Sequence, residues 1–154
     1  MSPQRIGGAV RREASLLRRD ETVRDAVAAI VEAGVPALPV VDEKGRLVGI
    51  FGEREFIGAL FPGYLKELGY AGFVPRSLDE ALEKRAGCAS DLVGEHMNSD
   101  HIDVGEDFSD TQIAEVFLHH RVLIVPIVDD RKVTGIVTRQ DFFRALARRF
   151  LDHS

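Results

Sequence analysis

The chain has 154 residues, with 45% hydrophobic and 29% charged side chains and a formal net charge of −5. This balance is typical of globular proteins, and the length is sufficient for one compact core or for two small subdomains that share one. A mildly acidic chain argues against bulk nucleic-acid binding, which needs a basic surface. Cys88 is the single cysteine, so the chain contains no internal disulfide.

The sequence also bears on localisation. No apolar run approaches the roughly 18 residues that a membrane-spanning helix needs, and the N-terminus lacks the apolar core of a signal peptide. We therefore expect a cytoplasmic protein without a membrane span. One local exception to the acidic balance keeps nucleic-acid binding as a minor alternative, namely the arginines near the N-terminus: Arg5, Arg11, Arg12, Arg18 and Arg19.

The first predicted elements lie within residues 1–60. A short strand is expected near residues 14–17, followed by a helix with Thr22 as its N-cap. The apolar positions of this helix recur at helical spacing: Val23, Ala26, Val27, Ile30 and Val31. Two β-branched, apolar runs then predict strands over residues 38–41 and 47–51, joined by a polar turn. A last helix is expected from about Glu53.

Residues 61–90 form a predicted helical insertion. A turn is expected at residues 61–64, and the sequence of residues 77–80 is typical of a capping box that opens a helix. The insertion carries four aromatic residues that either pack on the rest of the chain or face a partner: Phe61, Tyr64, Tyr70 and Phe73.

Residues 91–154 repeat the order of elements seen in residues 1–60. A strand is expected near residues 101–104, and Ser109 is positioned to cap a helix whose apolar stripe contains Ile113, Val116 and Phe117. Strands are predicted over residues 123–128 and 133–137. A final helix is expected from about Arg139.

The two halves align residue by residue. The segment Gly34–Asp42 matches Arg121–Asp129, with Pro126 placed 87 residues after Pro39. The alignment predicts two copies of a β-α-β-β-α unit, a mixed α+β fold. A three-stranded sheet cannot cover its own apolar face, so the two copies should pack together. A proline lacks the donor of a strand ladder, which predicts that both prolines lie at a sheet edge or a bulge.

These segments resemble the cystathionine β-synthase (CBS) domain family. The resemblance rests on the apolar-Pro-apolar-apolar-Asp strand, the Gly-apolar-apolar strand end and the polar helix start that follows it. It implies two CBS repeats, residues 1–60 and 91–154, packed with pseudo-twofold symmetry into a Bateman module that often forms a homodimer. It further implies a regulatory rather than enzymatic role, in which an adenosine-containing ligand (AMP, ADP, ATP or S-adenosylmethionine) binds between the repeats and an effector protein reads the change.

The family's ligand motif is matched in the second repeat by Gly135–Asp141. The resemblance implies that the Thr138 hydroxyl binds a phosphate or ribose oxygen and that Asp141 accepts the ribose hydroxyls. A helix N-terminus also suits an anion. The purine would lie between apolar side chains of the strands: Ile102, Leu123, Val125 and Ile136. Read from the residues alone, Thr138 and Asp141 also fit a plain helix cap.

The first repeat departs from this motif. Gly52 stands where the family has threonine, and Glu55 stands where it has aspartate. We therefore expect the better site on the second repeat. Arg54 is expected by pseudo-symmetry near the phosphate end of that cleft, with a solvated surface arginine as the alternative. We identify no catalytic residues, metal ligands or cofactor. A ligand-free dimerisation or protein-interaction module is the competing function.

Overall fold

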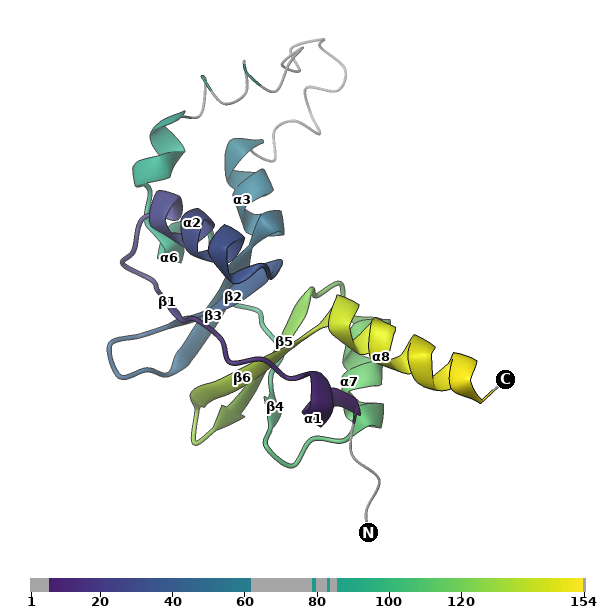
Figure 1. Ribbon diagram of the computed structural model, residues 1–154. Helices are drawn as coiled ribbons and strands as arrows, with labels where there is room; N and C mark the ends of the chain where they lie inside the picture. The colour runs from purple at the N-terminus through teal and green to yellow at the C-terminus, as the bar shows by residue number, and fades with distance from the viewer. Residues whose placement is uncertain (1–5, 62–78, 80–82, 84–85, 154) are drawn as a thin grey trace.

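The computed structural model describes residues 6–61, 79, 83 and 86–153, and it contains two three-stranded sheets with helices packed around them (Figure 1). The strand orders are β1-β2-β3 and β4-β5-β6. In each sheet the first pair is parallel and the second pair is antiparallel. The predicted mixed α+β fold with two copies of one unit is confirmed.

The elements follow one another in the predicted order. The first half contains α1 (Ile6–Val10), β1 (Leu17–Arg18), α2 (Val23–Ala33), β2 (Ala37–Val41), β3 (Leu47–Gly52) and α3 (Glu53–Leu60). The second half contains η1 (Ala86–Ser90), α6 (Val93–His96), β4 (Val104–Gly105), α7 (Asp110–His119), β5 (Ile124–Asp129), β6 (Lys132–Thr138) and α8 (Arg139–Asp152). The first strand of each half is shorter and begins later than its apolar pattern predicted.

Both predicted N-caps form the expected hydrogen bonds. The Thr22 hydroxyl accepts from the backbone N–H of Asp25 at 3.2 Å, and the Ser109 hydroxyl accepts from that of Gln112 at 3.1 Å. Each satisfies one of the amides that a helix start leaves without an intrahelical partner. Helix α2 ends at Gly34, whose φ of 68° lies in the left-handed region that glycine adopts readily.

Of the two predicted places for the strand prolines, a sheet edge or a bulge, the structure shows the second: both lie in central strands, close before a bulge. Pro39 pairs with Ile50 of β3, but the N–H and C=O of Ile50 bond to Asn98 on its other side. Ile50 of β3 therefore needs no hydrogen bond from Pro39, which has no N–H to donate. Strand β1 begins to pair with β2 at the next residue, Val40. The predicted bulge follows at once, between Val40 and Val41.

The segment before the first strand of each repeat runs along the outer strand of the other repeat. Arg12 and Ile136 exchange two backbone hydrogen bonds of 2.9 Å, and Asn98 bonds to Ile50 in the same way at 2.9 and 2.8 Å. There is little room for a side chain beside each crossing. A Cβ at Gly135 would lie 3.1 Å from the Arg12 carbonyl oxygen, and one at Gly49 would lie 3.1 Å from the Asn98 carbonyl oxygen.

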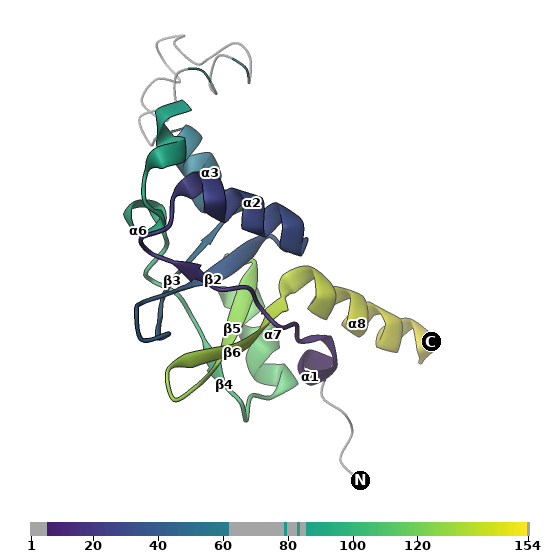
Figure 2. The same ribbon diagram turned by 60° about the vertical axis from the view of Figure 1, so that its left-hand side comes forward.

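The hydrophobic core is shared between the repeats. Ile124 and Ile136 of the second sheet belong to the cluster built on the first repeat, whereas Ile6 from the N-terminal helix is buried in the cluster of the second. In Figures 1 and 2 helix α1 accordingly lies beside α8, and α6 lies beside the first sheet. Neither repeat completes its core alone, which is the physical reason that the unit occurs twice.

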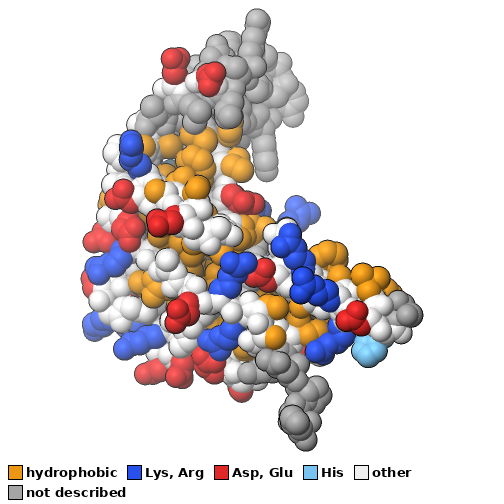
Figure 3. Space-filling view, in the orientation of Figure 1, with side chains coloured by type: hydrophobic (Ala, Val, Ile, Leu, Met, Phe, Trp, Pro, Cys, Tyr) orange, Lys and Arg blue, Asp and Glu red, His pale blue; other side chains and the backbone are white. Residues whose placement is uncertain are grey.

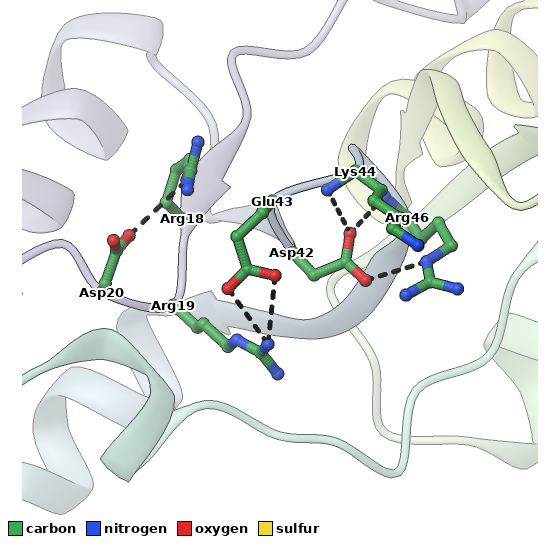
Figure 4. Close-up of polar contacts among 7 residues, drawn as sticks. All are labelled: Arg18, Arg19, Asp20, Asp42, Glu43, Lys44 and Arg46. Atoms are coloured by element: carbon green, nitrogen blue, oxygen red, sulfur yellow. Dashed lines mark hydrogen bonds and ion pairs between the residues drawn. The ribbon is translucent and has the colours of Figure 1, made fainter.

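The turns between the paired strands explain why the second copy is one residue shorter. In the first turn the Asp42 carboxylate accepts from the backbone N–H groups of Lys44 and Arg46 at 2.9 and 3.0 Å and from the Arg46 Nε at 2.9 Å (Figure 4). The second turn has only two residues between its paired ends, Asp130 and Arg131, both with positive φ, as type I′ hairpins require.

Most of the predicted insertion lies outside the described residues, including residues 77, 78 and 80 of its proposed capping box and three of its aromatic residues, Tyr64, Tyr70 and Phe73. Phe61 packs against a small buried cluster of Ala59, Leu60 and Cys88. That contact supports core packing, rather than a partner-facing role, for this one aromatic side chain.

Candidate ligand-binding site

The motif threonine of the second repeat acts as a helix cap. Thr138 ends β6, is buried, and accepts a hydrogen bond from the backbone N–H of Asp141 at 3.1 Å. The plain-cap interpretation is therefore confirmed for the Thr138 hydroxyl. The reciprocal half of a capping box is missing, because the Asp141 side chain is turned to another partner.

That partner is Arg12 from the segment before β1. The Asp141 Oδ2 accepts from the Arg12 Nε at 2.6 Å, and Oδ1 accepts from Nη2 at 3.1 Å. These hydrogen bonds from Arg12 are the main reason that the pKa of Asp141 lies below the ordinary aspartate value. The site thus presents a carboxylate that is ionised at neutral pH and already paired with a cation.

The start of α8 offers fewer free amides than the sequence alone suggests. The first helical N–H, that of Arg139, donates to the Leu123 carbonyl at 2.9 Å, and the third, that of Asp141, is taken by Thr138. Attraction for an anion at this end rests mainly on the Arg139 guanidinium and the helix dipole.

The four apolar residues predicted to enclose the purine do not all lie around one cavity. Leu123 reaches the start of α8 and lines a cavity there. Ile102 is half-buried against the core of the second repeat. Val125 and Ile136 are 0% and 1% exposed inside the two hydrophobic clusters, so their side chains serve packing rather than a cavity wall.

A cavity of about 700 Å³ lies between the starts of α3 and α8. Figure 3 shows the surface hollowed between the parts of the molecule that carry these two helices, with Lys and Arg side chains on the α8 side. Both repeats contribute to it, and it is lined by Gly34, Val35, Pro36, Glu53, Leu123, Arg139, Gln140 and Phe143. We refer to it below as the central cavity.

Most of these lining residues were not identified from the sequence. Arg139 and Gln140 lie inside the recognised motif, between Thr138 and Asp141, and that adjacency was an available signal. Pro36 and Glu53 carry no motif of their own, and only the packing of the two repeats brings them to the cavity.

A second, nearly closed cavity of about 30 Å³ lies between the start of α3 and the segment that leads into β5. Arg54 lines this small cavity and not the central one; its side chain is exposed and donates a hydrogen bond from Nη1 to the Arg121 carbonyl. The Glu55 carboxylate accepts from the Gly52 N–H at 2.9 Å, and burial raises the pKa of Glu55.

There is little room for a side chain at position 52. A Cβ at this position would collide with the Ala37 side chain and the Pro36 carbonyl and would lie 2.7 Å from the Ala37 Cα. The family's threonine therefore does not fit this backbone. The equivalent pair in the second repeat, Ile124 and Thr138, accommodates the threonine, so the close approach of β2 to β3 accompanies the glycine in the first repeat.

The basic N-terminal cluster is neutralised within the fold. Arg11 pairs with Glu106 at 2.7 Å, and Arg19 with Glu43 at 3.2 Å. Arg18 lies 3.5 Å from Asp20, as Figure 4 shows, while Arg12 holds Asp141. Arg5 lies outside the described residues. The four described arginines thus form no free basic surface for nucleic acid.

One group of possible metal ligands lies away from the cavity. Asp91, Glu95 and His96 place ligand atoms within 4.8 Å of one another. Their own contacts account for this grouping, since the His96 Nε2 lies 2.8 Å from the Asp91 Oδ2 and Glu95 accepts from the Leu92 N–H at 3.2 Å.

In the part of the chain that the structure describes, no helix has both the length and the apolar character that a membrane crossing requires.

Solved structures share this fold over nearly the whole chain. The CBS domain of a membrane protein from Sphaerobacter thermophilus is 25% identical, with a TM-score of 0.68 over 92% of this chain and 86% of that one. The CBS-pair protein CBSX2 from Arabidopsis thaliana is 22% identical, with a TM-score of 0.72 over 96% and 97%. CBSX2 has also been solved in complex with AMP, and that structure gives a TM-score of 0.67.

Sequence comparison gives the same family. The A-adding tRNA nucleotidyltransferase of Aquifex aeolicus is 24% identical over 133 residues, which are 85% of this chain but only 13% of that enzyme. The family model for the CBS domain matches residues 8–62 and again residues 90–148. The chain belongs to the CBS domain family, with two copies of the domain in tandem.

Proposed function

We propose that the chain is a regulatory module that binds an adenosine-containing ligand beside the start of α8 and passes the signal to a partner protein. The observation that carries the proposal is the size and position of the central cavity. It holds about 700 Å³ and is lined by Arg139 and Gln140, which lie between Thr138 and Asp141 in the motif, whereas the cavity beside Arg54 and Glu55 of the first repeat holds about 30 Å³. Small-molecule sites commonly occupy about 300–1,000 Å³.

The lining residues, together with Asp141, which follows Arg139 and Gln140 in α8, provide the chemistry that an adenosine compound needs. Asp141 is an ionised acceptor for two ribose hydroxyls, although Arg12 must share or release it. Leu123, Val35 and Pro36 give apolar surface for a purine. Arg139 supplies a cation for a phosphate at the positive end of the α8 dipole.

The comparisons support this function. CBSX2, which has the same fold, has been crystallised with AMP. A fold shared at 22% identity makes an adenosine ligand a reasonable first candidate for this chain, while the lining residues decide which compound binds.

Calorimetric titration and thermal unfolding with adenosine, AMP, ADP, ATP and S-adenosylmethionine test the proposal. A ligand that binds only the folded state raises the unfolding midpoint. We expect at least one compound to do so, and we expect Asp141→Asn to weaken it at least tenfold. Asp129→Asn, in an exposed turn, is the matched control. Unchanged affinity in Asp141→Asn would remove the site assignment, and no binding of any compound would remove the function.

A dimerisation or protein-interaction module is the second candidate, and exposed apolar side chains on the helices favour it. Val31 is 74% exposed on α2, Leu118 is 79% exposed on α7, and Phe143 and Phe150 are 65% and 74% exposed on α8. A second copy of the chain that covers these helices would bury them. Light scattering should then give the mass of a dimer, and Phe150→Asp should shift it to the monomer; a wild-type chain that is monomeric at high micromolar concentration would exclude the homodimer.

A further inference from the structure

The central cavity carries opposite charges at equivalent positions of the two repeats. Glu53 is the first residue of α3 and Arg139 the first of α8. Their backbone N–H groups make the same contact in each repeat, to the Pro36 carbonyl and to the Leu123 carbonyl, both at 2.9 Å. Both members of each pair line the cavity, which therefore spans the two repeats but is basic on the α8 side and acidic on the α3 side.

We propose that Glu53 makes the cavity selective for nucleoside monophosphates over the corresponding triphosphates. This inference rests on the proposed function and names its ligand class. With the ribose at Asp141, a first phosphate lies on the α8 side near Arg139. Each additional phosphate extends across the cavity toward α3, where the Glu53 carboxylate repels it.

Two features leave the Glu53 carboxylate able to repel a phosphate in the cavity. Its side chain is exposed at the cavity rather than buried in the core. The neighbouring cation, Arg54, lines the small cavity of about 30 Å³ and donates to the Arg121 carbonyl there. The Glu53 carboxylate also offsets the positive end of the α3 helix dipole, which would otherwise attract an anion. Helix α8 has no acidic residue at its first position.

Electrostatics sets the size of the expected effect. Two charges several ångströms apart in a solvent-exposed cleft change a binding constant by roughly three- to tenfold. Salt screens such a contact within a Debye length of about 8–10 Å at moderate ionic strength. The selectivity should therefore decline as salt is added.

The test is the ratio of the ATP to the AMP dissociation constant, measured by calorimetry without divalent cations so that ATP keeps its full charge. We expect wild-type protein to bind ATP at least five times more weakly than AMP. Glu53→Gln should lower this ratio at least threefold, while Glu53→Asp, which keeps the charge, should preserve it. Glu115→Gln removes an exposed carboxylate on α7 and should leave the ratio unchanged.

Three results would overturn the inference: tighter binding of ATP than AMP by wild-type protein, an unchanged ratio in Glu53→Gln, or an equal fall in Glu115→Gln. The proposed function survives any of them provided that AMP binding still depends on Asp141. Absence of binding by every adenosine compound would instead remove the proposed function, and this inference with it.

Discussion

Arg12 and Asp141 are 129 residues apart in the chain and form a two-bond ion pair, with contacts of 2.6 and 3.1 Å. Asp141 is the residue proposed to accept the ribose hydroxyls, so the chain's own N-terminal segment holds that acceptor. The pair is partly exposed, with 45% of the Arg12 side chain and 17% of the Asp141 side chain accessible. Such a pair contributes about 0.2–1 kcal/mol, which a ligand is able to offset.

Arg12→Ala should strengthen binding of an adenosine compound by up to about fivefold, the change that corresponds to the upper end of the free energy of the lost ion pair. The substitution frees both oxygens of Asp141 and leaves Thr138 and the cavity unchanged. Calorimetry with uncharged adenosine isolates this effect, because adenosine offers no phosphate to the arginine. Arg18→Ala, which removes an exposed arginine paired with Asp20, serves as the control. Weaker binding in Arg12→Ala would mean that Arg12 positions Asp141 rather than competing for it.

Gly52→Thr restores the family's residue in the first repeat, and we expect it to lower stability without creating a second ligand site. The new side chain has no room beside Ala37 and Pro36. Overpacking of this kind typically costs about 1–3 kcal/mol. Chemical denaturation gives the stability change, and calorimetric stoichiometry reports the number of sites. A folded variant of wild-type stability that binds two ligands per chain would show that the steric explanation is wrong.

The turn that contains Asp42 should make the stability of the fold depend on pH in the acidic range. Hydrogen bonds to the carboxylate, above all from the Arg46 N–H, hold the pKa of Asp42 below its ordinary value of 3.8. A lowered folded-state pKa stabilises the fold above the ordinary value, and that contribution is lost as pH falls through the folded-state pKa.

Asp42→Asn should therefore lower the unfolding midpoint at neutral pH, and the difference from wild type should shrink as pH falls below about 4. Thermal unfolding between pH 3 and pH 7 measures it. The equivalent Asp129 is exposed, so Asp129→Asn should show a much smaller difference from wild type. A constant gap between wild type and Asp42→Asn over the whole range would contradict the role of the charge.

Much of the fold was predictable because its signals are local. Thr22 and Ser109 cap helices where the chain places a hydroxyl before an apolar stripe, and the last helices begin at Glu53 and Arg139 as expected. The sequence did not place Pro39 in a central strand, because that position depends on β1 and β3 pairing on the two sides of β2.

The candidate site was predictable only in part. The motif located Thr138 and Asp141, and the alignment exposed the departures at Gly52 and Glu55. The sequence did not distinguish strand residues that face a cavity from those that are buried in a core. Val125 and Ile136 proved to be core residues. Alternation along a strand separates two faces, but in this fold both faces are covered.

The sequence by itself determined the family, the two-copy architecture and the helix starts, because repeats, periodicity and caps are written within a few neighbouring residues. Tertiary structure alone decided that Arg12 holds Asp141, that Arg54 turns to the Arg121 carbonyl, and that Glu53 and Arg139 share one cavity. These relationships join segments that meet only when the repeats pack. Their geometry follows from burial of a shared core, which no local pattern encodes.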